Sequence, residues 1–315
     1  MEKKNRICAY KGDPVVPGVN KKKNGINFAV EVPGDTEASL VLYRKGAAEP
    51  ETEFPFSEEY RTGRMCAMLV TGLRPERYEY NFRIDGKIVQ DPFACVIRGR
   101  EKFGAPLSKD EHEVRCAFLS EKEYDWEGDT APEIPYSEMI LYKIHVRGYT
   151  RQAKLALRKR GTFAGLTEMI PYWKELGINA VELMPAYEFQ ECVQADYAVN
   201  LAVRKKSDDR INYWGYTRGF YFAPKESYCA TKEPDREFRD MIRALHKAGI
   251  ECIMEMYFPK GTPSLQMIRS LWFWKLYYHV DGFHLLGDGV QQDVIERDPI
   301  LYGTKKLFSN VSGEA

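Results

Sequence analysis

The residue types that most often carry chemistry are scattered along this chain and form no local motif. Five histidines are present, and none forms the His-x-x-x-His pair of a zinc-binding helix. Seven cysteines include no Cys-x-x-Cys pair, and their odd number is typical of reduced, buried thiols in a cytoplasmic protein. Glycine-rich phosphate loops and the Gly-x-Ser-x-Gly elbow are absent. We therefore expect no metal, no cofactor and no nucleotide.

Length and charge exclude further classes of protein. The chain has 315 residues, which favours about two domains. Lys plus Arg number 46 and Asp plus Glu number 46, so the basic surplus of a nucleic-acid binder is missing. A charged start without an apolar run predicts no signal peptide, and no run of 18 apolar residues predicts a membrane span. We expect a cytoplasmic protein that binds neither nucleic acid nor membrane.

The first part of the chain has the rhythm of short strands. Apolar or alternating runs lie at residues 26–32, 39–43, 65–70 and 77–84, and turn residues separate them. Asp85-Gly86 after the last run is a hairpin signal. This spacing predicts a small antiparallel β-sandwich, and the acidic, proline-containing residues 121–136 predict a linker.

Strands alternate with helices in the second part of the chain. Predicted strands lie at residues 139–146, 180–184, 250–256, 281–286 and 304–308. Helical spacing covers residues 166–176, 235–248 with Asp235 as the N-cap, and 264–278. This alternation predicts βα units and a parallel sheet. Periodicity alone does not separate a barrel from an open sheet.

Several motifs in order resemble the isoamylase and glycogen-debranching, pullulanase-like branch of the α-amylase-family glycoside hydrolases. The segment Ile-Leu-Tyr-Lys-Ile-His-Val-Arg-Gly-Tyr-Thr at residues 140–150 is similar to that family's first barrel strand. Val-Glu-Leu-Met-Pro-Ala-Tyr-Glu-Phe at residues 181–189 resembles the second strand and its exit loop. Asn-Tyr-Trp-Gly-Tyr at residues 212–216 is a distinctive signature of the branch. Tyr-Arg-Thr-Gly at residues 60–63 and Asp-Pro-Phe-Ala at residues 91–94 resemble its carbohydrate-binding β-sandwich.

The resemblance implies a multidomain β plus α/β fold. Residues 1–120 would form an antiparallel β-sandwich like a carbohydrate-binding module, and residues 121–136 a linker. Residues 137–315 would form a partial, truncated TIM (β/α) barrel of about five strands. A complete barrel takes about 250 residues, whereas this segment has 315 − 136 = 179. Three explanations stay open: a longer protein, strands supplied by a partner, or a remodelled end.

The family hydrolyses glycosidic bonds with three carboxyl groups. At the positions that match them, the resemblance implies that this chain has other residues. Leu286 stands where the family has its nucleophile, and leucine cannot form a glycosyl ester. Ser309 stands where the family has its general acid, and a hydroxyl is too weak an acid for that role. The family's third acid belongs after the seventh strand, which this chain does not reach. We therefore expect a pseudoenzyme without hydrolytic activity.

Four residues remain as candidates for substrate binding. Glu255 and His284 stand where the family pattern has aspartate and arginine, and Tyr213 and Tyr216 match aromatics that line or support its sugar subsites. We expect them to contact an α-glucan such as glycogen or starch. Trp214, between the tyrosines, is expected to pack beneath the loop.

Two other functions stay open. An active α-1,6-glucosidase would need relocated carboxylates, for which Asp288 and Glu255 are the obvious positions. Asp288 lies two residues beyond the nucleophile's place, a shift of about 6–7 Å along a strand. Alternatively, a non-enzymatic assembly or regulatory subunit would dock a protein partner through the open edge of the barrel.

Overall fold

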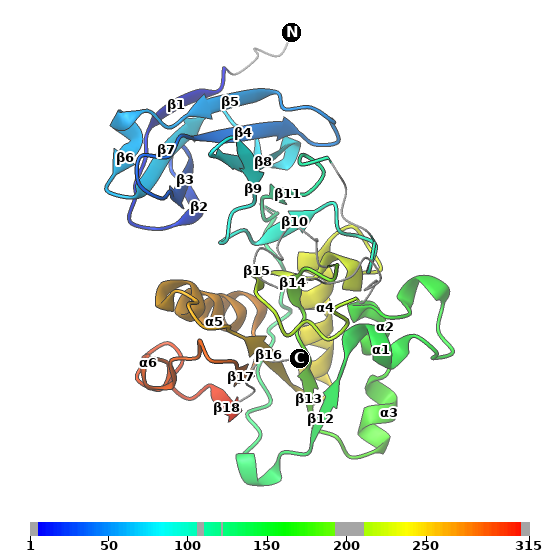
Figure 1. Ribbon diagram of the computed structural model, residues 1–315. Helices are drawn as coiled ribbons and strands as arrows, with labels where there is room; N and C mark the ends of the chain where they lie inside the picture. The colour runs from blue at the N-terminus through cyan, green and yellow to red at the C-terminus, as the bar shows by residue number, and fades with distance from the viewer. Residues whose placement is uncertain (1–5, 106–109, 121, 193–210, 310–315) are drawn as a thin grey trace, which may run out of the picture. The chain divides into compact units, whose positions relative to one another are not determined.

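The computed structural model describes residues 6–105, 110–120, 122–192 and 211–309 (Figure 1). The chain forms two compact units. The first comprises Met1–Gly99 and Ser108–Glu123, and the second comprises Arg100–Leu107 and Tyr124–Ala315.

Two antiparallel sheets make up the first unit. One has the strand order β1-β7-β3-β2 with β6 beside β7, and the other has the order β10-β11-β8-β4-β5 with β9 beside β8. The strands are β1 (Cys8–Lys11), β2 (Gly18–Lys22), β3 (Gly25–Glu31), β4 (Ala38–Arg44), β5 (Thr52–Pro55), β6 (Arg61–Thr62), β7 (Met65–Thr71), β8 (Tyr78–Ile84), β9 (Lys87–Val89), β10 (Val96–Arg98) and β11 (Arg115–Ala117). The four strand runs predicted from the sequence are confirmed as β3, β4, β7 and β8.

Aromatic side chains join the two sheets of the first unit. Phe28 of β3 and Tyr80 of β8 meet edge to face, with ring centroids 5.2 Å apart. Tyr43, Tyr78 and Tyr80 are buried, so these tyrosines stabilise the core. The predicted hairpin after β8 is also confirmed, because β8 pairs with β9 and both turn residues have a positive φ, 51° at Asp85 and 73° at Gly86.

The second unit is built on a five-stranded sheet with the order β12-β13-β16-β17-β18. Every neighbouring pair in it is parallel. Its strands are β12 (Leu141–Ile144), β13 (Ala180–Leu183), β16 (Glu251–Tyr257), β17 (Gly282–Leu286) and β18 (Lys305–Ser309), and the strands β14 (Tyr187–Phe189) and β15 (Gly219–Pro224) form a separate antiparallel pair. The sequence therefore predicted the parallel sheet correctly.

Six α-helices occur in the described residues, all of them in the second unit. They are α1 (Val146–Thr150), α2 (Phe163–Thr167), α3 (Ile170–Glu175), α4 (Pro234–Lys247), α5 (Ser264–Tyr278) and α6 (Gln292–Glu296). Short 3-10 turns lie at η1 (Glu58–Tyr60), η2 (Pro75–Arg77), η3 (Tyr136–Glu138), η4 (Leu157–Lys159) and η6 (Glu226–Tyr228). None of the helices in the described part of the chain has both the length and the apolar character of a membrane span.

Two predicted helix boundaries were wrong. The single helix expected at residues 166–176 is divided into α2 and α3, because α3 restarts with Pro171 in its first turn. Proline has no N–H to donate to the preceding turn, so it belongs at a helix start. Helix α4 begins at Pro234, so Asp235 is not its N-cap. Asp235 instead forms an ion pair with Arg239 and accepts a hydrogen bond from the Tyr278 hydroxyl at 3.1 Å.

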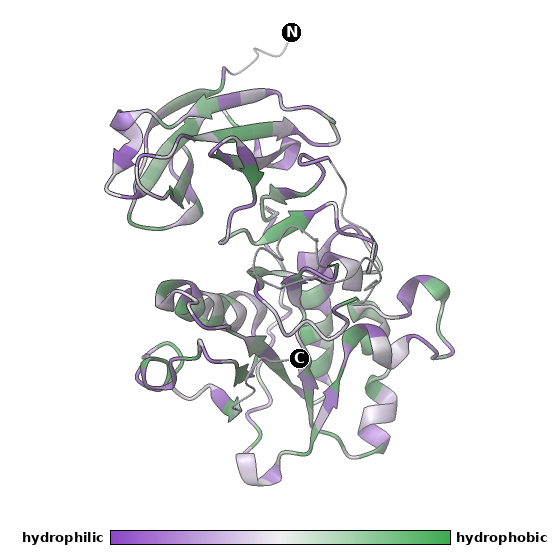
Figure 2. Ribbon diagram, viewed as in Figure 1, coloured by the Kyte–Doolittle hydropathy of each residue, from purple (hydrophilic) through white to green (hydrophobic). Residues whose placement is uncertain are grey.

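The helical side of the second unit is packed with aromatic rings. Phe238 of α4 lies 5.0 Å from the Trp274 ring and 5.1 Å from the Tyr278 ring, both of α5. Helix α4 also packs against β16, and Figure 2 shows hydrophobic colouring along that strand. Side chains alternate along a strand, so Glu255 points to the opposite face from Met254 and Met256. That opposite face carries the polar residues described next.

Candidate functional site

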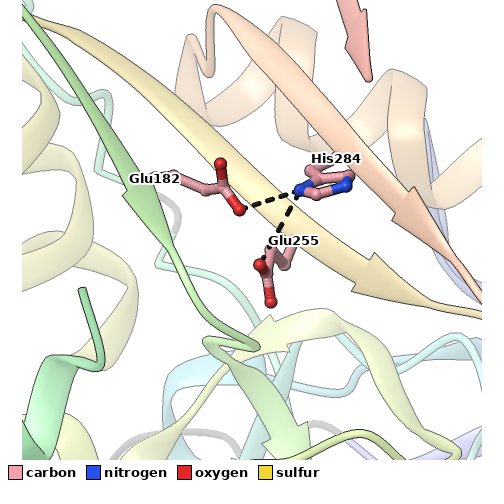
Figure 3. A group of neighbouring side chains, drawn as sticks. All are labelled: Glu182, Glu255 and His284. Atoms are coloured by element: carbon pink, nitrogen blue, oxygen red, sulfur yellow. Dashed lines mark hydrogen bonds and ion pairs between the residues drawn. The ribbon is translucent and has the colours of Figure 1, made fainter. Parts of the chain in front are cut away.

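Ionisable side chains from four neighbouring strands meet on the polar face of the parallel sheet. Lys143 comes from β12, Glu182 from β13, Glu255 from β16 and His284 from β17. The register places Lys143 beside Glu182 and Glu255 beside His284. Figure 3 shows Glu182, Glu255 and His284 turned toward one another across these strands. We call these four residues the inner cluster.

Short polar contacts hold the inner cluster together. His284 Nδ1 lies 2.8 Å from Glu182 Oε1 and 3.8 Å from Glu255 Oε1 (Figure 3). The Lys143 ammonium forms an ion pair with Glu255 Oε1 and lies 3.6 Å from Glu182 Oε1. Two carboxylates therefore share one lysine and one imidazole.

Two hydroxyl groups fix the orientation of the cluster from outside. The Tyr216 hydroxyl donates to Glu255 Oε2 at 2.7 Å. The Ser309 Oγ lies 2.7 Å from His284 Nε2, on the far side of the ring from Glu182. Both the glutamate and the imidazole thus have a second partner that limits their rotation.

Burial raises the pKa of both carboxyl groups, and their hydrogen bonds then drive the two values apart. Burial and the hydrogen bond shared with Glu182 raise the pKa of Glu255 to about 7, although Lys143 opposes them. For Glu182, burial alone would raise the pKa, but hydrogen bonds to His284 and Glu255 hold it at about 2. Glu255 is 0% exposed, so no solvent compensates its charge. The pair therefore carries a proton more readily than two separate surface glutamates would.

The structure brings together several residues that the sequence singled out. Tyr216, Glu255, His284 and Ser309 form one connected set of contacts. Leu286 is 3% exposed and lies in register with Ser309 at the ends of β17 and β18. The two positions where the resemblance implies catalytic carboxylates are thus adjacent, and they carry a buried leucine and a histidine-bound serine.

Tyr213 belongs to a different cluster. Its ring stacks on His145 with the centroids 4.4 Å apart, and the Tyr213 carbonyl lies 2.9 Å from His145 Nε2. Tyr228 also contacts that nitrogen, at 3.0 Å through its hydroxyl. Burial lowers the pKa of His145 to about 4, so this ring is neutral near pH 7. A neutral, stacked histidine is typical of a rigid support for the neighbouring loop.

The loop that carries the aromatic signature is set by Asn212 and Gly215. The Asn212 side chain accepts a hydrogen bond from the Gly215 N–H at 3.1 Å, and the Asn212 N–H donates to the Glu191 carbonyl. Gly215 has a φ of 82°, and a Cβ there would lie 2.5 Å from the Phe189 ring. The Asn-x-x-Gly spacing therefore shapes this turn, since only glycine fits both the backbone angle and the contact.

Trp214 was predicted incorrectly. It is 53% exposed, whereas the sequence predicted that it packs beneath the loop. Its ring meets His145 edge to face at 5.6 Å, so one edge is held while much of the surface stays open. Such a held, exposed indole can stack on an apolar face of a ligand.

Sequence reasoning missed Glu182 and Lys143. Each sits in a short, otherwise mainly apolar strand, and each pairs with the cluster across the sheet. A signal existed: charged residues inside predicted buried strands are rare unless they are paired. Asp288, the other carboxylate considered from the sequence, is exposed in the turn after β17.

The chain resembles isoamylases and proteins of glycogen metabolism in sequence. No protein-family model matches it. It is 30% identical over 282 residues to isoamylase 1 of Arabidopsis thaliana, covering 81% of this chain and 35% of that protein. It is 31% identical over 281 residues to the glycogen operon protein GlgX homolog of Haemophilus influenzae, covering 81% of this chain and 40% of that protein. The chain thus spans only 35% to 40% of the length of these two curated relatives.

Solved structures of a glycogen-degrading virulence factor and of a pullulanase share the fold. The catalytic module of the pneumococcal virulence factor SpuA aligns with a TM-score of 0.68 and 19% identity, covering 97% of this chain and 52% of that one. Apo pullulanase from Paenibacillus barengoltzii gives a TM-score of 0.66 and 19% identity, covering 87% of this chain and 48% of that one. The same pullulanase has been solved with maltohexaose and alpha-cyclodextrin.

Proposed function

Because the chain is a homologue of the isoamylases and glycogen-debranching enzymes of the α-amylase family, we propose that it binds α-glucans of the glycogen and starch type without hydrolysing them. The single observation that carries this proposal is the pair Leu286 and Ser309. They lie in register at adjacent strand ends, and the sequence resemblance implies that these are the positions of the family's nucleophile and general acid. Neither side chain performs the chemistry that those positions require.

The carboxylates near these positions do not replace the missing ones. Glu255 is fully buried, forms an ion pair with Lys143 and accepts a hydrogen bond from the Tyr216 hydroxyl. Glu182 is buried against His284. Asp288 is exposed, but it lies in a turn two residues beyond Leu286. A displacement reaction needs its reacting atoms about 3–3.5 Å from each other. The positions of these three carboxylates therefore support a chain without hydrolytic activity.

Glucan binding is supported by the relatives and by the exposed aromatic surface. Related pullulanases have been solved with maltohexaose and with maltotetraose. In this chain Trp214 offers an exposed ring, and Tyr213 supports it from the side at 5.2 Å. We assign Trp214 and Tyr213 to sugar contact, with Tyr216 linking the contact surface to Glu255.

The architecture belongs to the same proposal. The five parallel strands correspond to a partial (β/α) barrel, and the two sheets of the first unit to a carbohydrate-binding-module-like β-sandwich. Residues 1–120, 121–136 and 137–315 remain the proposed sandwich, linker and barrel. The seven cysteines form no disulfide bond in the described structure, which supports a cytoplasmic location.

Affinity electrophoresis in gels containing glycogen tests the proposal. The wild-type chain should be retarded by glycogen, and the Trp214→Ala variant should migrate faster because it has lost its exposed ring. Trp272→Phe is the matched control, because Trp272 is a tryptophan of α5 that bonds Asp298. Equal mobility of the wild-type chain with and without glycogen would contradict glucan binding.

A docking function is the second candidate. Strands β12 and β18 form the two edges of the five-stranded sheet, with one partner strand each among the described residues. Unpaired edge strands are templates for pairing with another chain. Light scattering after size exclusion tests this candidate: a stable monomer that still binds glycogen would count against docking.

A further inference from the structure

Three side chains of the inner cluster have the chemistry of metal ligands. Glu182, Glu255 and His284 each offer one ligand atom, and these atoms all lie within 4.8 Å of one another. A tetrahedral zinc site with bonds of about 2.0–2.1 Å has ligand atoms about 3.3 Å apart. The distances from His284 Nδ1, 2.8 Å to Glu182 and 3.8 Å to Glu255, lie on either side of that value. From this geometry we propose that Glu182, Glu255 and His284 bind a divalent transition-metal cation, with Zn²⁺ as its best probe.

The outer partners of these ligands are already in place. Histidine ligands commonly use the second ring nitrogen for a hydrogen bond, and carboxylate ligands are hydrogen-bonded in turn. His284 has Ser309 at its Nε2, and Glu255 has Tyr216 at its Oε2. Both contacts leave the facing atoms, Nδ1 and Oε1, directed into the cluster (Figure 3).

One ligand oxygen is poorly satisfied by the protein alone. Glu255 Oε1 is buried and accepts no hydrogen bond of regular geometry in the described structure. Its counter-charge is the ion pair with Lys143, whose side chain is 44% exposed. Lys143 can therefore turn toward solvent, whereas the three ligands cannot. A dication would balance both carboxylates, and the lysine balances only one.

The donor set selects the type of metal. One imidazole and two carboxylates suit Zn²⁺, Mn²⁺ or Fe²⁺, whereas Ca²⁺ prefers six to eight oxygen ligands. Three protein ligands leave a fourth position for water. The ligands come from β13, β16 and β17, three neighbouring strands, so the ion would join the centre of the sheet. This site does not depend on glucan binding.

Replacing Lys143 separates metal binding from a purely structural role of the inner cluster, because only a metal site predicts tighter Zn²⁺ binding. The ammonium lies beside both carboxylates, so Lys143→Met should tighten Zn²⁺ binding roughly tenfold or more, because it removes a like charge. His284→Asn and Glu182→Gln should weaken binding by at least about a hundredfold, since each removes a ligand. Tyr216→Phe and Ser309→Ala should weaken it by about 10–100-fold.

Isothermal titration of chelator-treated, reduced protein with Zn²⁺ measures these effects. His279→Asn is the matched control, because His279 bonds Asp129 away from the inner cluster and should leave affinity unchanged. Zinc bound to the seven cysteines would persist in His284→Asn. The difference in Zn²⁺ affinity between His279→Asn and His284→Asn therefore reports on the inner cluster alone.

Two results would overturn the proposal. One is equal Zn²⁺ binding by the wild-type chain and His284→Asn. The other is weaker binding by Lys143→Met than by the wild-type chain. Circular dichroism confirms folding, and if the ligand variants unfold, Lys143→Met decides alone because all three ligands remain in it.

Discussion

Glu255 gives a prediction whose sign and size follow from the structure. Its carboxyl group is buried among Lys143, Glu182, His284 and Tyr216, and its pKa rises from 4.5 to about 7. Between pH 4.5 and about 7 the native state therefore keeps this carboxyl group protonated, whereas the unfolded chain has already released the proton. Stability that Glu255 contributes below pH 4.5 is lost as the pH rises through 7. Each pKa unit is worth about 1.4 kcal/mol, so the loss is about 3 kcal/mol.

Glu255→Gln isolates this effect, because glutamine keeps the shape of the protonated acid and never ionises. The variant and the wild-type chain should be about equally stable near pH 4.5. At pH 8 the variant should be more stable by about 3 kcal/mol. Urea unfolding with a metal chelator present, at several pH values, measures the difference. Two results would refute this prediction. One is a difference in unfolding free energy that stays constant with pH, and the other is a wild-type chain that becomes more stable than the variant above pH 5.

Three further predictions concern other parts of the second unit. Trp274→Ala should cost about 3–5 kcal/mol of unfolding free energy, because it leaves a cavity between α4 and α5; urea unfolding checks this. Trp214→Ala should weaken maltohexaose binding roughly tenfold in calorimetry while leaving the melting temperature unchanged. For His246, burial alone would lower the pKa, but the hydrogen bonds to Asp281 and Asp129 raise it above 6.5. The advantage of the wild-type chain over His246→Asn should therefore be full below pH 6.5 and shrink as the pH rises, as melts at pH 5.5 and 9 will show.

Local patterns predicted the elements of the second unit where no breaker interrupts them. The predicted helix at residues 264–278 matches α5, and the predicted strand at residues 281–286 matches β17 to within one residue. The helix predicted at residues 166–176 failed because Pro171 allows a new start, which an apolar count does not register. Asp235 failed as a cap for a related reason, since Pro234 takes the first helical turn.

Only two of the four residues of the inner cluster could be predicted from the sequence. The resemblance drew attention to Glu255 and His284, because they depart from the family's aspartate and arginine. Lys143 and Glu182 lie about 40 residues apart in sequence and meet only through the register of β12 and β13. Register between parallel strands is set by packing of the whole sheet, and no local pattern encodes it. Trp214 was mispredicted because exposure depends on how the Asn212–Gly215 turn is oriented.

Release of reducing sugar from glycogen and pullulan tests the central claim most directly. Purified chain is incubated with each glucan beside a heat-denatured control, and reducing ends are counted over time. We predict no release above that control, because we propose that Leu286 and Ser309 replace the nucleophile and the acid. Sustained release would contradict it, and loss of that release in Glu255→Gln or Asp288→Asn would identify the relocated carboxylate.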